Sequence, residues 1–361
     1  MKRKIYIWAL LAPLLLIASC KHDDLSMVKP NENLRPVADF IKNNYEMTLF
    51  SAALDKVGYS DQLNAEGPFT FLVPTDLAFN ELGVYRASDF DKMNIDSLKR
   101  IIGYHILPRR LTLNDVPTNG VDIRYATLEG SSLYASLAST VPGGGSLVNE
   151  LYFSGSDVVR KDVIVANGVL HVLNQVMKPN FDISTQQWLA QRPDYSVFVA
   201  GLKKFNLWEQ LSGSGLFTVF APDNQALEAV GITQETLNTM NANDYKGDLL
   251  FGSYLLYDRH FFISDAQVFS IINSDSRFMY FLKNDTHYME YYAGKNYPSF
   301  KLSYTLKLRT GNTVYDQVVR EVTSTIVGRN DNLCSNGLVH HLVEGLVRPE
   351  EAIKRQDINH E

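Results

Sequence analysis

Two stretches of the sequence decide the fold: FTFLVPTDLAF at residues 69–79 and FTVFAPDNQAL at residues 217–227. They align without a gap when the chain is shifted by 148 residues. Each opens with a continuous apolar run, which predicts a short strand buried on both faces. A proline then ends the run, and Thr75 or Asp223 follows as a good N-cap for a short helix. The same strand-to-helix unit is therefore predicted twice.

The repeat extends well beyond these two stretches. The FSAAL of residues 50–54 aligns with the FVAGL of residues 198–202 at the same shift. The NGVLH of residues 167–171 aligns with the NGLVH of residues 336–340 at a shift of 169, so the second copy carries about twenty-one extra residues in its middle. Solenoid repeats run only about 20–50 residues, whereas these units are domain-sized. The chain is therefore a tandem duplication, and we expect each copy to own a separate core.

Periodicity gives a coarse structure for the first copy. Helical spacing or capping predicts helices over residues 37–43, 47–57, 75–82 and 96–106, while residues 69–73, 121–165 and 169–177 are typical of strands. Asn167-Gly168 predicts a tight turn that tolerates positive φ. His171 shares a strand face with Val169 and Leu173, which predicts a core histidine rather than a metal ligand.

These blocks resemble the hallmarks of the fasciclin family, the FAS1 domain. The first hallmark is the block at residues 69–79 and 217–227, and the second is NGVLHVL at 167–173 and NGLVHHL at 336–342. The resemblance covers residues 37–350. It implies an α+β fold in which each domain is a twisted β wedge or sandwich flanked by helices. The expected units are two domains over 37–180 and 181–350, a β insertion in the second over about 266–330, and a polar tail over 351–361.

The family also carries a Tyr-His pair after a helix, and this sequence has it once, as Tyr104-His105. The second copy departs from the pattern, because Gly252-Ser253-Tyr254 stands where Gly103-Tyr104-His105 would align. In animal relatives this region is implicated in integrin binding, so the resemblance makes Tyr104 and His105 candidate binding residues. The alternative is structural: His105 bonds to neighbouring backbone and fixes the helix end. We expect the structural role to dominate.

The extra segment of the second copy is rich in aromatic residues, with nine between residues 278 and 304. Residues 300–309 alternate apolar and polar side chains, which predicts a half-buried strand whose solvent face carries Lys301, Lys307 and Arg309. Tyrosine suits both sheet cores and contact surfaces. Both uses stay open, and the hypothesis is that the interface anchors include some of four tyrosines: Tyr288, Tyr291, Tyr292 and Tyr297.

The N-terminus reads as a targeting signal. Lys2, Arg3 and Lys4 precede an apolar stretch over residues 5–18, which is short for a membrane-spanning helix and typical of a secretory leader. The sequence LIASC at 16–20 resembles a bacterial lipobox, which predicts cleavage after residue 19 and a lipid on Cys20. Residues 20–36 are then a lipidated tether, and the KHDD that follows Cys20 is similar to the surface-export signal of Bacteroidota-type lipoproteins. A plain signal peptide with an incidental cysteine is the alternative.

Composition excludes several classes of protein. The net charge is −6 and no cluster of Lys and Arg follows the leader, which argues against nucleic-acid binding. The 2 Cys and 8 His are scattered without metal-binding spacing, so we predict neither a metal site nor a cofactor. There is no GxSxG sequence and no phosphate-binding glycine loop. The sequence therefore favours a protein that is not an enzyme.

Together these features predict a cell-surface lipoprotein of the outer membrane, facing the exterior, that mediates adhesion or binds a protein or glycan through tandem fasciclin domains. The alternative is an accessory glycan- or peptide-binding subunit of an outer-membrane, TonB-dependent nutrient-uptake complex. No feature of the sequence separates the two hypotheses, and none names the ligand.

Overall fold

The computed structural model describes residues 34–64, 67–141, 145–272, 278–283, 286–296, 301–311, 313, 315–324 and 329–354. Its contacts divide the chain after Arg35, and residues 36–361 form one compact unit that holds both copies of the repeat. Cys20 and Tyr297 lie outside the described residues. Among the helices that the structure describes, none is long and apolar enough to cross a membrane.

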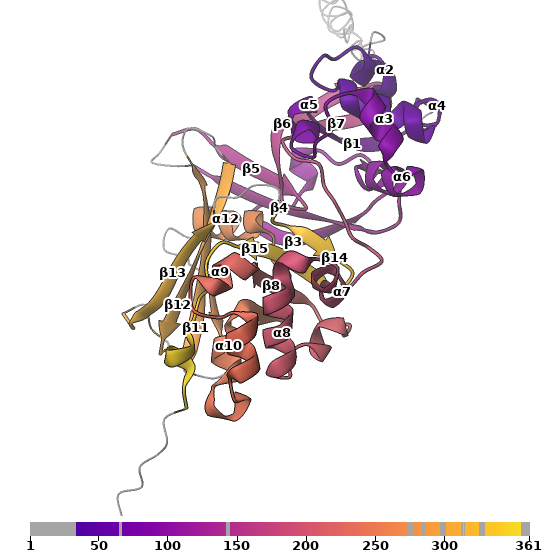
Figure 1. The fold of residues 1–361 in the computed structure, drawn as a ribbon. Helices are drawn as coiled ribbons and strands as arrows, with labels where there is room; N and C mark the ends of the chain where they lie inside the picture. The colour runs from indigo at the N-terminus through magenta and orange to yellow at the C-terminus, as the bar shows by residue number, and fades with distance from the viewer. Residues whose placement is uncertain are drawn as a thin grey trace, which may run out of the picture. The chain divides into compact units, whose positions relative to one another are not determined.

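The first copy folds as a domain in which helices precede and cover a sheet (Figure 1). The predicted helices and strands are confirmed, with boundaries that differ by a few residues. The helices are α2 (Val37–Lys42), α3 (Thr48–Val57), α4 (Ser60–Leu63), α5 (Asp76–Asn80) and α6 (Ile95–Tyr104), and the strands are β1 (Phe69–Pro74), β2 (Ile106–Leu107), β3 (Gly120–Ala126), β4 (Ser132–Thr140), β5 (Val148–Phe153), β6 (Ser156–Val165) and β7 (Gly168–Leu173).

The sheet of the first domain has the strand order β2-β1-β7-β6-β5-β4-β3. Strand β1 runs parallel to β7, the two strands predicted from the hallmark blocks, and Phe69 lies opposite Gly168. All of β1 after Phe69 is buried, as its unbroken apolar run predicts. One cluster of buried side chains packs these strands against the helices, with Phe50, Leu54 and Phe71 among its members.

The role of the glycine in the Asn-Gly pair differs from the prediction. Gly168 is absent from the residues with positive φ and instead begins strand β7. A Cβ on Gly168 would lie 2.0 Å from the carbonyl oxygen of Phe69, and one on Gly337 would lie 2.1 Å from that of Phe217. The glycine is therefore needed for the close approach of the neighbouring strand. The predicted tight turn is present, since Ala166 and Asn167 form a turn between β6 and β7, but Gly168 itself does not use a positive φ.

The second copy follows the same plan, but its strands form two sheets where those of the first copy form one. Its helices are α7 (Thr185–Ala190), α8 (Ser196–Lys204), α9 (Asn224–Glu228), α10 (Gln234–Thr239), α11 (Gly247–Leu250) and α12 (Ile263–Ile272), and its strands are β8 (Phe217–Pro222), β9 (Leu255–Tyr257), β10 (Phe278–Phe281), β11 (His287–Asn296), β12 (Lys301–Thr310), β13 (Val318–Ser324), β14 (Asn332–Cys334) and β15 (Gly337–Leu342). The sheets have the orders β14-β15-β8-β9 and β10-β11-β12-β13. Short 3₁₀ turns occur in both domains, over Ala87–Lys92, Leu113–Asp115, Pro193–Tyr195, Glu209–Ser212, Ala242–Asp244, Gly252–Tyr254 and Pro349–Ala352.

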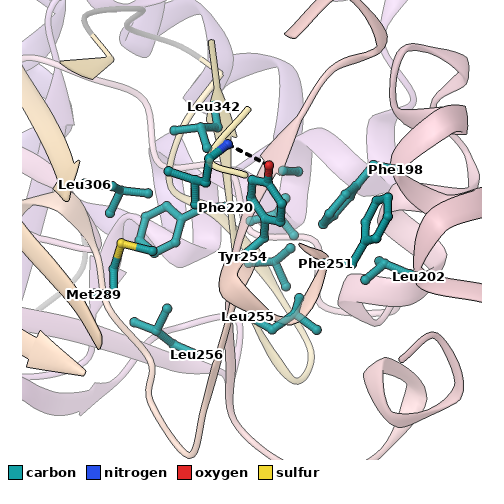
Figure 2. Packing of buried hydrophobic residues seen from close by; sticks show 14 of the residues in the cluster. Phe198, Leu202, Phe220, Phe251, Tyr254, Leu255, Leu256, Met289, Leu306 and Leu342 are labelled. Atoms are coloured by element: carbon teal, nitrogen blue, oxygen red, sulfur yellow. Dashed lines mark hydrogen bonds between the residues drawn. The ribbon is translucent and has the colours of Figure 1, made fainter. Parts of the chain in front are cut away.

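The core of the second domain joins its helices to both sheets. Figure 2 shows Phe198 and Phe251 from the helical side, Phe220 from β8 at the centre, and Met289 and Leu306 from the β10–β13 sheet. All five side chains are completely buried. The β10–β13 sheet is therefore part of the domain's core, rather than a loop on its surface.

A further cluster belongs to both domains, which corrects the expectation of two separate cores. Phe262, Leu333 and Leu338 of the second domain are buried in the same apolar cluster as Leu72, Tyr104 and other residues of the first. Helix α12 also contacts strand β4 of the first domain. Each domain still has a cluster of its own, but the two domains share a third.

The last described residues pack on the second domain. Ala352 is completely buried, and its carbonyl oxygen accepts a hydrogen bond of 2.7 Å from the backbone N–H of Lys246. Ile353 pairs with Tyr245 in an isolated bridge, and the N–H of Lys354 donates to Asp244 at 2.9 Å. Residues 351–354, expected as part of a polar tail, therefore belong to the folded domain.

Candidate functional site

The threonine of each hallmark strand ties down the same loop in its own domain. The hydroxyl of Thr70 donates to the carbonyl oxygen of Arg109 at 2.7 Å and accepts from the N–H of Leu111 at 2.8 Å. Thr218 makes the equivalent pair of bonds with Arg259 and Phe261, at 3.0 and 3.1 Å. Both threonines are completely buried, so these hydroxyl groups serve the scaffold.

The histidine of the second hallmark block completes the same loop. His171 Nε2 donates to the carbonyl oxygen of Leu111 at 2.8 Å, and its Nδ1 accepts from the N–H of Asp162 at 3.3 Å. His340 repeats both bonds, with distances of 2.8 Å from Nε2 to its carbonyl partner and 3.2 Å from its amide partner to Nδ1. Burial lowers the pKa of both imidazoles, that of His340 to about 4. The prediction of a core histidine at residue 171 is confirmed, and the ring is neutral.

The asparagine of the same block anchors the start of each domain. Asn167 Oδ1 accepts a hydrogen bond of 3.1 Å from the N–H of Val37, and Asn336 Oδ1 accepts one of 2.8 Å from the N–H of Thr185. The side-chain nitrogen of Asn336 donates to the carbonyl oxygen of Leu211 at 2.9 Å. Since the hallmark side chains are engaged in holding backbone, they offer no polar surface to a ligand.

The side chains of Tyr104 and His105 have the structural role that was expected to dominate over a binding role. His105 Nδ1 donates to the carbonyl oxygen of Ile101 at 2.8 Å and so fixes the end of α6, while Nε2 accepts from the N–H of Met177 at 3.1 Å. The hydroxyl of Tyr104 donates to the carbonyl oxygen of Ser132 at 3.1 Å. Both side chains are completely buried, and burial lowers the pKa of His105 to about 4. A binding role for Tyr104 and His105 is therefore contradicted.

The second copy keeps the function of the missing histidine with a different residue. Tyr254 aligns with His105, and its hydroxyl accepts a hydrogen bond of 2.7 Å from the N–H of Leu346, the residue that aligns with Met177 (Figure 2). Tyr254 is completely buried against Phe198. The departure from the family pattern therefore replaces one acceptor by another at the same backbone group.

Two of the four candidate tyrosines of the insertion are core residues, so they cannot be interface anchors in this fold. Tyr291 is completely buried, with its ring 5.1 Å from Phe220 and 5.9 Å from Tyr304. Tyr288 is completely buried too, and its hydroxyl donates to the carbonyl oxygen of Thr313. Sheet packing accounts for both, because cross-strand neighbours and the domain core cover the rings. Tyr297 lies outside the described residues, and its role stays a prediction.

Tyr292 lies on the other face of the sheet, in a set of paired charges. Its half-buried ring lies 5.5 Å from Lys307 Nζ, and its hydroxyl donates to Glu321 at 3.2 Å. Lys307 in turn pairs with Glu321 at 3.1 Å, and Arg309 pairs with the completely buried Glu290 at 3.1 Å. The predicted basic solvent face of strand β12 was therefore wrong at residue 309, where Arg309 is 8% exposed.

Charged and polar groups also meet where the two domains touch. Asp265, at the start of α12, is buried and accepts hydrogen bonds from the hydroxyl of Ser136 in the first domain and from the N–H of Phe262 at 3.0 Å. Lys295 pairs with Glu150 at 3.2 Å and with Asp157 at 2.9 Å across the same junction. Burial raises the pKa of Asp265 to about 7. Sequence reasoning missed this junction, because an aspartate in the first turn of a helix indicates only an interaction with that helix's own N-terminus.

The geometry defines a pair of α+β domains in which the same side chains hold the same loops twice. The fasciclin domain model matches residues 45–179 and again residues 193–348. The chain therefore belongs to the fasciclin domain family.

Similar proteins come from animals and from a cyanobacterium. Mouse Stabilin-2 is 26% identical over 217 residues, which is 58% of this chain and 8% of Stabilin-2. Human periostin is 28% identical over 192 residues, or 53% of this chain and 21% of periostin. Protein sll1483 of a Synechocystis strain is 31% identical over 145 residues, or 40% of this chain and 73% of that protein. The chain thus spans only a small part of the animal relatives.

Among solved structures, the chain is similar to a FAS1 domain pair from the insect cell adhesion molecule fasciclin I. The match has 17% sequence identity and a TM-score of 0.36, and it covers 85% of this chain and 98% of that one.

Proposed function

We propose that this protein is a lipid-anchored surface protein that mediates adhesion or binds another macromolecule without catalysis. The observation that carries the proposal is the tandem pair of fasciclin domains, which family matching finds over most of the chain. The leader and Cys20 supply the anchor in this proposal, and the KHDD that follows Cys20 supplies the signal for export to the cell exterior. An outer-membrane location follows from the same two features.

The state of the polar groups supports a role in binding over one in chemistry. The hallmark histidines bond to backbone on both nitrogens and are buried, so they are not placed to take a proton from a substrate. Cys334 is 5% exposed, and burial raises the pKa of its thiol to about 12, which opposes formation of a nucleophilic thiolate. Within the described residues, no group of three or more His, Cys, Asp or Glu side chains could hold a metal ion.

The anchor is tested by fatty-acid labelling of wild type and of Cys20→Ala in a bacterial host. The variant is expected to lose the label and to leave the membrane fraction, because several acyl chains are needed for stable anchoring. Equal labelling of the two proteins would refute the lipid anchor. Protease treatment of intact cells then tests the exterior location: a protein that resists cleavage until the cells are broken does not face the outside.

The alternative is an accessory subunit that binds glycan or peptide beside a TonB-dependent transporter. Affinity capture of the wild-type protein from intact membranes, followed by mass spectrometry, distinguishes the two. A transporter recovered in near-equal amount supports the uptake complex. Recovery of the protein without one, together with attachment of protein-bearing cells to a glycan- or protein-coated surface, supports adhesion.

A further inference from the structure

A hollow of about 320 Å³ opens on the second domain beside helix α7. It is lined by aromatic, guanidinium and carboxylate groups, from Trp188, Arg192, Asp194, Tyr195, Arg329 and Asn332. We propose that this hollow binds an acidic sugar, whose carboxylate pairs with Arg192 and whose hydroxyl groups bond to Asp194. The inference rests on the proposed binding function and names a ligand class for it.

The positive charge of Arg192 favours an anionic ligand in the hollow. Its guanidinium lies 3.7 Å from the ring centre of Trp188, and Nη1 donates to the carbonyl oxygen of Trp188 at 2.8 Å. Among the described residues it makes no ion pair, and burial lowers its pKa. Arginine stays charged even so, because its ordinary pKa is above 12. Among the described residues, the hollow therefore contains a half-buried cation that has unused N–H donors and forms no ion pair of its own.

Arg329, the other cation of the hollow, is already neutralised. It lies 3.6 Å from Asp194 and 3.5 Å from Asp223. The first domain has the same arrangement, since Arg160 pairs with Glu46 at 3.2 Å in the equivalent place. An ion pair that recurs in both copies belongs to the shared scaffold. Arg329 therefore lines the hollow as a paired cation, whereas Arg192 is the cation that forms no ion pair among the described residues.

The first copy serves as an internal control for the remaining groups. The shift of 148 residues still holds here, because Val37 and Thr185 donate to equivalent asparagines. At that shift Trp188 corresponds to Phe40, Arg192 to Asn44 and Tyr195 to Met47. The scaffold thus folds without a cation or an indole at these positions. The second copy holds groups that the fold does not require.

The indole of Trp188 supplies a second donor without a partner. Trp188 is 4% exposed, and its Nε1 is buried with no hydrogen-bond partner among the described residues. A buried N–H that lacks an acceptor costs free energy, which a ligand oxygen would recover. Arg192 therefore stands beside a lining residue that has an unpaired N–H donor of its own.

Asp194 decides which kind of anion fits. Its side chain is 75% exposed beside the hollow, so it would repel a bare anion but accept hydrogen bonds from hydroxyl groups. A sugar acid carries both a carboxylate and hydroxyls, whereas the carboxylate of a peptide end lacks neighbouring hydroxyls. The volume of about 320 Å³ lies at the lower end of the range for small-molecule sites, roughly 300–1,000 Å³, which suits one sugar unit.

The test is calorimetric titration of the full-length, detergent-solubilised protein with sodium glucuronate, sodium galacturonate, glucose and N-acetylglycine. At least one of the two sugar acids is expected to bind, and glucose and N-acetylglycine are expected to bind much more weakly. Arg192→Gln should weaken the sugar acid about tenfold or more, since a charge-assisted hydrogen-bonded contact is lost. Arg192→Lys keeps the charge but loses the planar guanidinium, so its affinity for the sugar acid should lie between those of wild type and Arg192→Gln.

Lys203→Gln is the matched control, because it removes an exposed cation of the same domain that does not line the hollow. It should bind like wild type. Absence of binding by both sugar acids overturns the inference, as does unchanged affinity in Arg192→Gln. If glucose binds as tightly as the sugar acids, the ligand's carboxylate is not recognised and the inference is wrong. If N-acetylglycine binds as tightly, the ligand's hydroxyl groups are not recognised and the inference is wrong too. These outcomes are independent of lipid labelling and surface attachment, so the inference can fail while the proposed function stands.

Discussion

Asp265 of helix α12 accepts a hydrogen bond from the hydroxyl of Ser136, a residue in strand β4 of the other domain. Both residues are almost fully buried, so the bond forms where the two domains exclude water. A carboxyl group in such a place is costly to ionise. Burial accordingly raises its pKa to about 7. The junction of the two domains therefore contains a group whose charge changes near neutral pH.

The carboxyl group of Asp265 makes the folded state less stable as the pH rises. Its folded pKa of about 7 lies above the unfolded value, so its contribution is fully present below about pH 4 and is lost as the pH rises through 7. The slope is about 1.4 kcal/mol per pH unit within that window. Asp265→Asn keeps the shape and cannot ionise. Urea unfolding at pH 5 and pH 7.5 should therefore show the variant gaining stability relative to wild type at the higher pH.

Wild type and Asp265→Asn must be compared at each pH, because other groups in the protein also change stability with pH. Burial also raises the pKa of Asp331, to about 7, which acts in the same direction and remains in the variant. His105 and His340 have their pKa lowered to about 4, so they add stability as the pH rises from about 4 to 6.5. An equal pH response of wild type and Asp265→Asn would contradict a neutral carboxyl at the junction.

The shared apolar cluster predicts that some core substitutions are felt in both domains. Leu338 lies on β15 of the second domain and is completely buried in that cluster. Leu338→Ala should lower the free energy of unfolding by about 2–5 kcal/mol. Hydrogen exchange measured by mass spectrometry should then show faster exchange in strands β4 and β5 of the first domain as well as in β8 and β15.

Leu54→Ala is the control for that experiment. Leu54 is 1% exposed and belongs to the cluster of the first domain alone. Its loss should speed exchange chiefly in helices α3 and α6. If Leu338→Ala likewise affects only its own domain, the shared cluster does not couple the two.

Much of the fold, and less of the site, could be predicted from the sequence. The hallmark strands, the N-caps Thr75 and Asp223 and the core role of His171 follow from local rules of pattern and capping. The burial of Tyr288 and Arg309 does not, because alternation predicts only which face a side chain takes and not what covers that face. The Asp265–Ser136 bond joins residues 129 positions apart, which no local pattern can indicate.

The replacement of His105 by Tyr254 in the second copy gives a direct test of its structural role. The hydroxyl of Tyr254 accepts from the N–H of Leu346 at 2.7 Å, in a completely buried place. Tyr254→Phe leaves that N–H without its acceptor and should cost about 1–3 kcal/mol of unfolding free energy. Tyr292→Phe is the control, because its hydroxyl bonds at the exposed side of a sheet and should matter by less than about 1 kcal/mol. Similar losses in chemical denaturation would show that burial does not set the cost.

Two buried tyrosines on neighbouring strands β11 and β12, Tyr291 and Tyr304, have rings 5.9 Å apart and predict opposite effects for the same chemical change. Tyr304 donates its hydroxyl to the carbonyl oxygen of His341, whereas the hydroxyl of Tyr291 is buried and has no partner among the described residues. Removing an unpaired buried hydroxyl relieves a desolvation penalty, while removing a paired one leaves a buried carbonyl oxygen without its donor. Tyr291→Phe should therefore be neutral or stabilising by about 1 kcal/mol, and Tyr304→Phe should destabilise by about 1–3 kcal/mol. Thermal and urea unfolding of the two variants measure the difference. A loss of stability in Tyr291→Phe as large as that in Tyr304→Phe would contradict this prediction. It would mean that the hydroxyl of Tyr291 has a hydrogen-bond partner and stabilises the fold.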